Sequence, residues 1–438
     1  MQNCTIEVYF NFPGDLKNMK TYFQRALQIN QRINELTQLS SDEQSVTRIF
    51  GTKPFQECSR VIASWMHQAG LETRIDNIGN VRGILKSKNP NAKTFLIGSH
   101  FDTVINGGKY EGILGVLSGL DVIENIISKN ISIPFNVELI AFSEDEGIRF
   151  NYSHLGSQVV AGTFQNKLLE IKDEEGQTLF DVLQSLNHDR EKLEHDAIPP
   201  ANCLGYFEIH IDQGNVLYEN NFPVAIVDSI SGQKRIEIKF TGKAGHAGTV
   251  RMEVRKDALA AAAKFILAVA KYALRTKGDL LATVGKIKID SAASNVIPGI
   301  VHCTLDIRSQ DAETLSEAYE FIYSECERIC DKRNIYFEWK LIQEIYPVDC
   351  NKKLKRLLAN SINEKKIQLA TVQSGACHDA AIISSIASVA MLFVRCFKSI
   401  GEISTENVEE KDIASALEVA DHFLHQLIYP AEKASRKK

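Results

Sequence analysis

Two apolar segments of strand length flank one of helical length, and this arrangement restricts the fold most strongly. Residues 93–99 (KTFLIGS) and 135–144 (FNVELIAFSE) are short and rich in branched and aromatic side chains, as in strands buried on both faces of a sheet. Residues 111–130 have the length and apolar content of a covering helix. The order predicts a parallel strand pair with a crossover helix, the repeating unit of α/β folds.

Polar residues follow both predicted strands. His100 comes directly after the first strand, and Asp145 and Glu146 come after the second. The carboxyl ends of parallel strands meet at one edge of a sheet, where open α/β folds bind their ligands. The sequence therefore predicts a site at this edge.

The pattern changes near residue 225, where strictly alternating segments begin. Strand, helix, strand, strand, helix and strand follow one another, which is the order of a ferredoxin-like α+β unit. The predicted strands are 234–240, 282–290, 299–309 and 335–341, and the predicted helices are 255–274 and 312–332.

Buried-strand and helix patterns then return at 388–394 and 409–428. We expect an α/β domain with a mixed, largely parallel sheet and helices on both faces, built from residues 1–224 and 342–438. The α+β unit at 225–341 is inserted into it, and a cleft between two such bodies is a common small-molecule site.

Composition restricts the class of protein. The 438 residues are 44% hydrophobic and 24% charged with a net charge of -5, which is typical of a globular protein and not of a nucleic-acid-binding one. No apolar run reaches the roughly 18 residues of a membrane span, and the N-terminus has no signal-peptide pattern, so we expect a cytoplasmic protein. The nine cysteines include no CxxC pair and should be reduced thiols.

Four separate segments supply residues of the kinds that bind metals. They are His100 in GSHFDTV, Glu111 in GGKYEG, Glu146 in SEDEG and His210 in FEIHIDQG. Each alone fits an ordinary hydrogen-bonded or solvated residue. Together, in glycine-rich turns, imidazoles and carboxylates suit zinc or another first-row divalent ion.

Seven motifs occur in an order that resembles one enzyme family. The chain is similar, over about residues 25–428, to the binuclear-metal amidohydrolases that include N-carbamoyl-L-amino-acid hydrolases, allantoate amidohydrolase and yeast-type β-ureidopropionase. The resemblance implies a catalytic α/β domain and an inserted lid that also forms a homodimer. The motifs are GSHFDTVINGGKYEGILGV, AFSEDEGIRF, LGSQVVAG, EIHIDQGNVLYE, GKAGHAGTVRMEVRKDALAAAA, SNVIPGIVHCTLDIRS and SGACHDAAII.

By this resemblance, His100 and His210 hold one metal and Glu146 holds the second, with Glu111 as the bridge. The family also uses a late histidine, for which the ungapped register gives Glu402. A three-residue shift gives Thr405 instead. The ungapped register is favoured because it alone matches Glu406 to the last glutamate of the motif.

The general base implied by the resemblance is Asp145, where the family has glutamate. Glu111 replaces aspartate and Glu402 replaces histidine, so all three departures remain carboxylates that bind hard cations. We expect two divalent ions, zinc or manganese, with one site left open as weak or empty. Asp145 is one methylene shorter than glutamate, and proton transfer needs hydrogen-bond contact. Either the longer Glu111 or a shifted metal must compensate for this difference, or the rate of hydrolysis falls.

Substrate contacts are also implied by the resemblance. His246 matches a histidine that stabilises the oxyanion, often from the partner subunit. Arg308 matches an arginine that clamps the substrate carboxylate. Asn295, Gln213 and His378 match further polar contacts.

Three functions are considered. The first is hydrolysis of a linear amide or ureido C–N bond in a small carboxylate-bearing substrate, of the N-carbamoyl amino acid or allantoate type. The second is a catalytically silent homologue that binds a carboxylate or acts as an interaction subunit, because three metal or base positions differ. Aminopeptidase activity rests on analogy of fold alone. No nucleic acid or membrane partner is expected.

Overall fold

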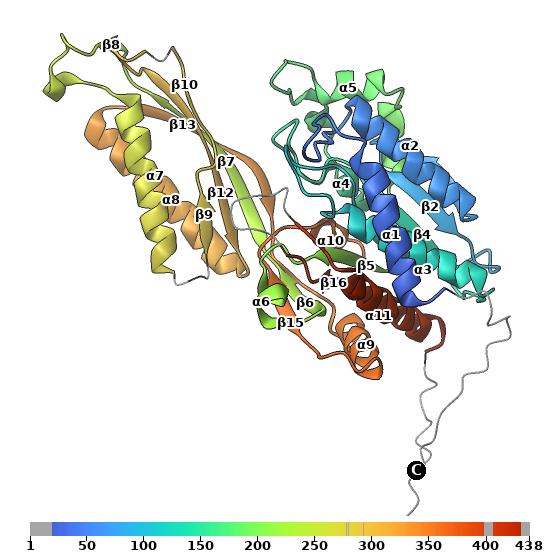
Figure 1. Ribbon diagram of the computed structural model, residues 1–438. Helices are drawn as coiled ribbons and strands as arrows, with labels where there is room; N and C mark the ends of the chain where they lie inside the picture. Colours follow the sequence, from blue (N-terminus) through green and yellow to red (C-terminus); the bar gives the residue numbers. More distant parts are fainter. Residues whose placement is uncertain (1–19, 277, 279, 292, 398–405, 431–438) are drawn as a thin grey trace, which may run out of the picture.

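The computed structural model describes residues 20–276, 278, 280–291, 293–397 and 406–430. Within these residues the chain forms a nine-stranded, a five-stranded and a two-stranded sheet, with helices packed on the two larger ones (Figure 1). Among the helices described, none is both long and apolar enough to cross a membrane.

The nine-stranded sheet contains the predicted strand-helix-strand unit, whose elements lie within two residues of their predicted bounds. Its strand order is β1-β2-β4-β3-β5-β16-β6-β14, and β15 pairs with β6. The strands are β1 (Glu72–Ile75), β2 (Val81–Leu85), β3 (Thr94–His100), β4 (Asn136–Phe142), β5 (Cys203–Ile211), β6 (Val224–Ile230), β14 (Val348–Asp349), β15 (Thr371–Ser374) and β16 (Val389–Val394).

The sheet is mixed, but it is less parallel than the sequence predicts. Within the described chain, four pairings are parallel, and they include the central run β4-β3-β5-β16. Another four are antiparallel and lie toward the edges. The turn between β1 and β2 is too short for the crossover that parallel pairing requires.

Helices cover both faces of this sheet, as predicted. Phe95 and Ile97 of β3 pack into one apolar cluster, whereas Leu96 between them packs into the other, because successive side chains of a strand point to opposite faces. The first cluster includes α1 (Tyr22–Thr37), α2 (Lys53–Gln68), α3 (Ile113–Ser128), α5 (Leu179–Ser185), α9 (Lys352–Glu364) and α11 (Glu410–Ile428). The second includes α6 (Val216–Asn220), α10 (Asp379–Ile383) and part of α4 (Leu155–Ala161).

The five-stranded sheet forms a smaller unit whose element order is the predicted one, except that the predicted strand 282–290 is divided into two short strands, β9 and β10. Its antiparallel strands are arranged β10-β12-β7-β13, with β9 beside β12. Side chains of β12 alternate strictly between buried and partly exposed, because the buried face packs on α7 and α8. The elements are β7 (Gly232–Thr241), α7 (Ala258–Arg275), β9 (Leu281–Thr283), β10 (Ile287–Ile289), β12 (Ile300–Ser309), α8 (Ala312–Arg333) and β13 (Tyr336–Ile345), and the two-stranded sheet is β8 (Gly245–His246) with β11 (Val296–Ile297).

The chain passes from the large sheet to the smaller one, and back again, at residues other than the predicted domain bounds of 225 and 341. β6 belongs to the large sheet, since it pairs with β15 and β16. The smaller sheet therefore begins with β7 at Gly232, and its last strand β13 continues to Ile345.

A close helix-sheet contact at Gly115 generates a stability prediction. A Cβ atom there would lie 2.0 Å from the backbone oxygen of Ile209, whereas one at Gly119 would meet only side-chain atoms, Cδ1 of Leu139 at 2.7 Å and Cγ2 of Ile97 at 2.9 Å. We expect Gly115→Ala to lower the free energy of unfolding by about 1–3 kcal/mol and Gly119→Ala to lower it less. Urea unfolding followed by circular dichroism measures both. Equal stability of Gly115→Ala and the wild type would contradict this packing.

Candidate metal and catalytic site

Two histidines lie side by side at the carboxyl ends of adjacent parallel strands. Gly98 of β3 pairs with Glu208 of β5, so two residues further along His100 stands next to His210. Their Nε2 atoms are 3.4 Å apart, and both rings are buried. The sheet register alone brings together two residues that are 110 positions apart in the sequence.

Backbone contacts orient both imidazoles towards one point. The Nδ1 atom of His100 lies 3.0 Å from the carbonyl oxygen of Asp102, and that of His210 lies 3.1 Å from the carbonyl oxygen of Ile211. A Nδ1–H that donates to a carbonyl leaves Nε2 available to bind a metal. Two ligands on a tetrahedral zinc ion with bonds of about 2.1 Å are separated by about 3.4 Å, so this donor pair fits such an ion.

Glu111 is held beside this pair by the turn that precedes α3. Gly112 has a φ of +68°, and a Cβ atom there would lie 2.5 Å from Cε1 of His100, so only glycine allows the approach. The carboxylate of Glu406 accepts hydrogen bonds from the backbone N–H groups of Tyr110, at 2.5 Å, and Glu111, at 3.1 Å. Glu406 thereby ties the late segment of the chain to the turn that carries Glu111.

The loop after β4 supplies two further carboxylates. The backbone N–H groups of Asp145 and Glu146 each donate to the carboxylate of Asp102 at 3.1 Å, which fixes the loop beside the histidines. Oδ2 of Asp145 lies 3.9 Å from Nε2 of His100. Burial, and next the charge of Glu111, raise the pKa of Glu146 well above its ordinary value. A cation between Glu111 and Glu146 would remove that repulsion.

A cavity of about 160 Å³ joins these groups. Eight of the eleven predicted site residues line it: His100, Glu111, Asp145, Glu146, His210, Gln213, Arg308 and His378. Gln213 donates a hydrogen bond to Oε1 of Glu111. Burial and then His210 lower the pKa of His378 well below its ordinary value, so this side chain is a neutral hydrogen-bonding group.

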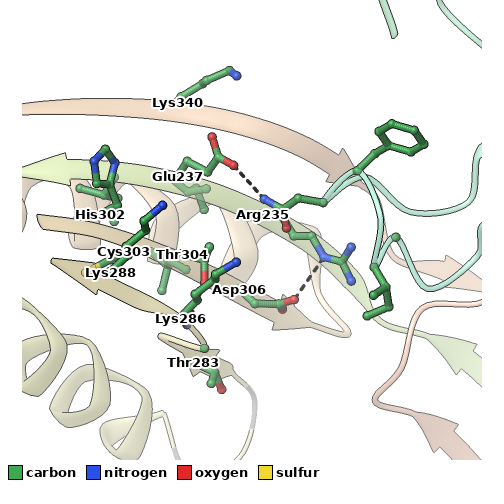
Figure 2. Close-up of a pocket in the computed structure, with 18 of the residues that line it drawn as sticks. Arg235, Glu237, Thr283, Lys286, Lys288, His302, Cys303, Thr304, Asp306 and Lys340 are labelled. Atoms are coloured by element: carbon green, nitrogen blue, oxygen red, sulfur yellow. Dashed lines mark hydrogen bonds and ion pairs between the residues drawn. The ribbon is translucent and has the colours of Figure 1, made fainter. Parts of the chain in front are cut away.

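The small cavity adjoins an open cleft of about 1020 Å³ beneath the smaller sheet, and Glu146, Arg235 and Arg308 line both. Figure 2 shows Arg235, Glu237, Thr304 and Asp306 on the face of β7 and β12 that lines this cleft. Nε of Arg308 donates to Asp306 at 2.9 Å. An arginine held by an acid behind it is a preorganised binding group for a carboxylate.

Three predicted residues are not brought to the cavity. His246 and Asn295 are exposed. His246 pairs with Val296 of β11, and the carbonyl of Asn295 accepts a hydrogen bond from the N–H of Ala247. The strand β8, which contains His246, lies at the end of the smaller unit that is far from the large sheet (Figure 1). Glu402, together with its alternative Thr405, lies outside the described residues.

Sequence reasoning missed several residues of the site, above all His154. Its Nδ1 atom lies 2.5 Å from Oδ1 of Asp145 and 3.8 Å from Oδ1 of Asp379. A single histidine in a loop shows no periodicity or spacing that could have revealed this contact. The other missed lining residues are Gln233, Arg235, Ala376 and Cys377.

The two histidines generate a prediction about metal binding. Burial opposes protonation of His100, but Asp145 and Asp102 raise its pKa to about 10, whereas burial and then His100 lower the pKa of His210 to about 4. At pH 7 His100 is therefore protonated and His210 is neutral. A metal that binds both Nε2 atoms must displace the additional proton of this pair. We expect zinc binding to release at least one proton and to tighten as the pH rises towards 10.

Calorimetric titration of zinc into the metal-free protein, in buffers of different ionisation enthalpy, counts the released protons. His100→Ala should bind zinc more weakly and release fewer protons, while the exposed-histidine variant His195→Ala should behave as the wild type. Zinc binding with no proton release at pH 7 would be inconsistent with this arrangement.

Comparisons with known proteins indicate the enzyme family of this chain. The chain is 33% identical over 398 residues to an N-carbamoyl-L-amino acid amidohydrolase of Geobacillus stearothermophilus, covering 91% of this chain and 97% of the relative. It is 33% identical over 446 residues to allantoate deiminase 1 of Glycine max, covering 94% and 92%. A crystal structure of AtUAH in complex with glyoxylate superposes with a TM-score of 0.86 at 28% identity, covering 92% and 97%.

Aminopeptidase PepT of Bacillus cereus, at 17% identity and a TM-score of 0.62, shares the fold. The model of peptidase family M20/M25/M40 matches residues 96–426, which include every described ligand candidate and both sheets' central strands. The chain belongs to the peptidase family M20/M25/M40.

Proposed function

We propose that this protein hydrolyses a linear amide or ureido C–N bond in a small carboxylate-bearing substrate, of the N-carbamoyl amino acid or allantoate type, with bound divalent metal. The observation that carries the proposal is the pair of Nε2 atoms 3.4 Å apart in a cavity that Glu111, Glu146 and Arg308 also line. The names of its relatives, N-carbamoyl-L-amino acid amidohydrolase and allantoate deiminase, support this substrate class.

The expected metals are two ions of zinc or manganese. As the family resemblance implies, His100 and His210 would hold one ion, Glu146 and Glu402 would hold the other, and Glu111 would serve both. The imidazole-rich site suits zinc, and the carboxylate-only site suits a harder ion such as manganese. When bound, such ions lower the pKa of water and polarise a carbonyl group.

The side chains of the cavity divide the remaining work. Asp145 takes a proton from the attacking water and returns it to the leaving nitrogen. Arg308 binds the substrate carboxylate, and Gln213 and His378 hold polar groups of the substrate. The neutral state of His378 lets it accept or donate a hydrogen bond without adding charge.

His246 and Asn295 act in a second copy of the chain. Both are exposed, and β8, which contains His246, lies at the distal end of the smaller unit, where a partner subunit can approach it. We propose a homodimer formed through this unit, in which His246 of one subunit completes the oxyanion-binding site of the other.

The function is tested by a substrate screen. Metal-free protein reconstituted with zinc, manganese, cobalt or nickel is assayed with N-carbamoyl amino acids, allantoate and a peptide panel. We expect turnover of a carbamoyl or ureido substrate, loss of activity on chelation, and at least a 10³-fold fall in kcat for His210→Ala, on the order of what a displaced metal-activated nucleophile costs. Cleavage of peptides alone would support the aminopeptidase hypothesis.

The same screen distinguishes the proposed hydrolase from the alternative, a catalytically silent homologue. Tight binding of a carboxylate ligand without turnover by any metal form would contradict the proposed hydrolysis. Activity that appears only in the combined variant Glu111→Asp, Asp145→Glu, Glu402→His would show that these three positions silence the site.

The shared site predicts complementation between inactive variants. His246→Ala and His100→Ala damage different subunits' contributions to one site, so a mixed dimer keeps one intact site. Mixing and reassembling equal amounts of the two inactive proteins should restore up to about a quarter of wild-type activity, from the statistics of random pairing. Assays of each variant mixed with itself are the control. No recovery in verified mixed dimers would contradict a contribution across the interface.

A further inference from the structure

The buried side chain of His154 contacts one carboxylate oxygen of Asp145, and the other oxygen lies nearer His100. Nδ1 of His154 lies 2.5 Å from Oδ1 of Asp145, while Oδ2 lies 3.9 Å from Nε2 of His100. His154 is 3% exposed. One carboxylate oxygen thus contacts the imidazole of His154, and the other lies on the side of His100.

The backbone around His154 is held in a conformation that few residues adopt. His154 has a φ of +61° and a ψ of 34°, a left-handed conformation that costs free energy for a side chain with a Cβ atom and is concentrated at functional sites. Two backbone hydrogen bonds maintain it, from His154 N–H to the carbonyl of Asp145 at 3.2 Å and from Leu155 N–H to that of Glu144 at 3.1 Å. The segment is therefore fastened to the loop that it orients.

A second buried carboxylate approaches the same ring nitrogen. Oδ1 of Asp379 lies 3.8 Å from Nδ1 of His154, and Asp379 is 1% exposed. Two carboxylates that converge on one imidazole nitrogen require a proton on that nitrogen, because a lone pair would repel both. The geometry fixes Nδ1 as the donor to Asp145.

We propose that His154 is a positioning residue for the base of the proposed hydrolysis. By holding Oδ1, it turns Oδ2 of Asp145 towards the cavity and compensates for a side chain that is one methylene shorter than glutamate. The inference rests on the proposed function in assigning proton transfer to Asp145. The need for such a device follows from the steep loss of rate, about 10²-fold, that a misplacement of 1 Å causes.

A different role for the cluster is a metal site. Ligand atoms of Asp145, His154 and Asp379 all lie within 4.8 Å of one another. A metal there would occupy Nδ1 of His154 and remove the hydrogen bond to Asp145. The 2.5 Å contact between the two side chains favours the hydrogen bond, since a bridging ion would need about 2 Å on each side.

The test compares crystal structures and kinetics of the zinc-loaded full chain with those of His154→Ala and His154→Asn. In His154→Ala we expect the Asp145 carboxylate to rotate and kcat to fall about 100-fold, with KM and zinc content nearly unchanged, and with circular dichroism verifying that the variant is folded. Asparagine tolerates the left-handed conformation and places its amide nitrogen near the position of Nδ1. His154→Asn should therefore retain the carboxylate orientation and most of kcat, and His195→Asn serves as the exposed control.

Each other outcome overturns the inference. An Asp145 carboxylate that keeps its orientation in His154→Ala, or a metal ion bound between Asp145, His154 and Asp379, contradicts positioning by His154, as does an unchanged kcat in an active enzyme. If the wild type hydrolyses no substrate, the proposed function fails, but the rotation of Asp145 in the crystals still decides whether His154 positions it.

Discussion

The parallel pairing of β3 with β5 is the constraint on which the site depends. It sets His100 beside His210 at the carboxyl edge of the sheet, with 3.4 Å between their Nε2 atoms. The other groups of the cavity reach this point on loops that the same edge supports. A one-residue slip of either strand would turn one histidine to the opposite face, so the hydrophobic packing that fixes the register also fixes the metal-binding geometry.

Charge explains why the loops around this pair are so heavily hydrogen-bonded. Several buried carboxylates surround two imidazoles, and burial without compensation would protonate them. Asp102 therefore accepts from the backbone of Asp145 and Glu146, and Glu406 accepts from the backbone beside Glu111. These bonds hold the loops in place, so that binding a cation requires displacement of a proton and little rearrangement of the chain.

The sequence predicts the strongly periodic parts of the structure and the residues that follow them. Apolar periodicity indicates which face of an element is buried. It therefore predicts β3, β4, α3 and the ferredoxin-like order. His154 and Arg235 are missed, because single polar residues show no period and their role depends on which loop folds against them. The sequence-based prediction overstates the parallel content of the large sheet, because the antiparallel edge pairings depend on short turns and on where the smaller unit is inserted. Neither His246 nor Asn295 lines the cavity, and their predicted roles require a partner subunit.

The departures from the family pattern have a physical interpretation. His154 lies 2.5 Å from Asp145, and in our proposal this contact orients a base that is one methylene shorter than glutamate. The central proposal is that a divalent ion binds between Nε2 of His100 and Nε2 of His210. Anomalous scattering from a crystal of the zinc-loaded protein tests it most directly. The account predicts a peak about 2.1 Å from both Nε2 atoms and within bonding distance of Glu111; a peak elsewhere, with these two nitrogens still in contact with each other, would contradict it.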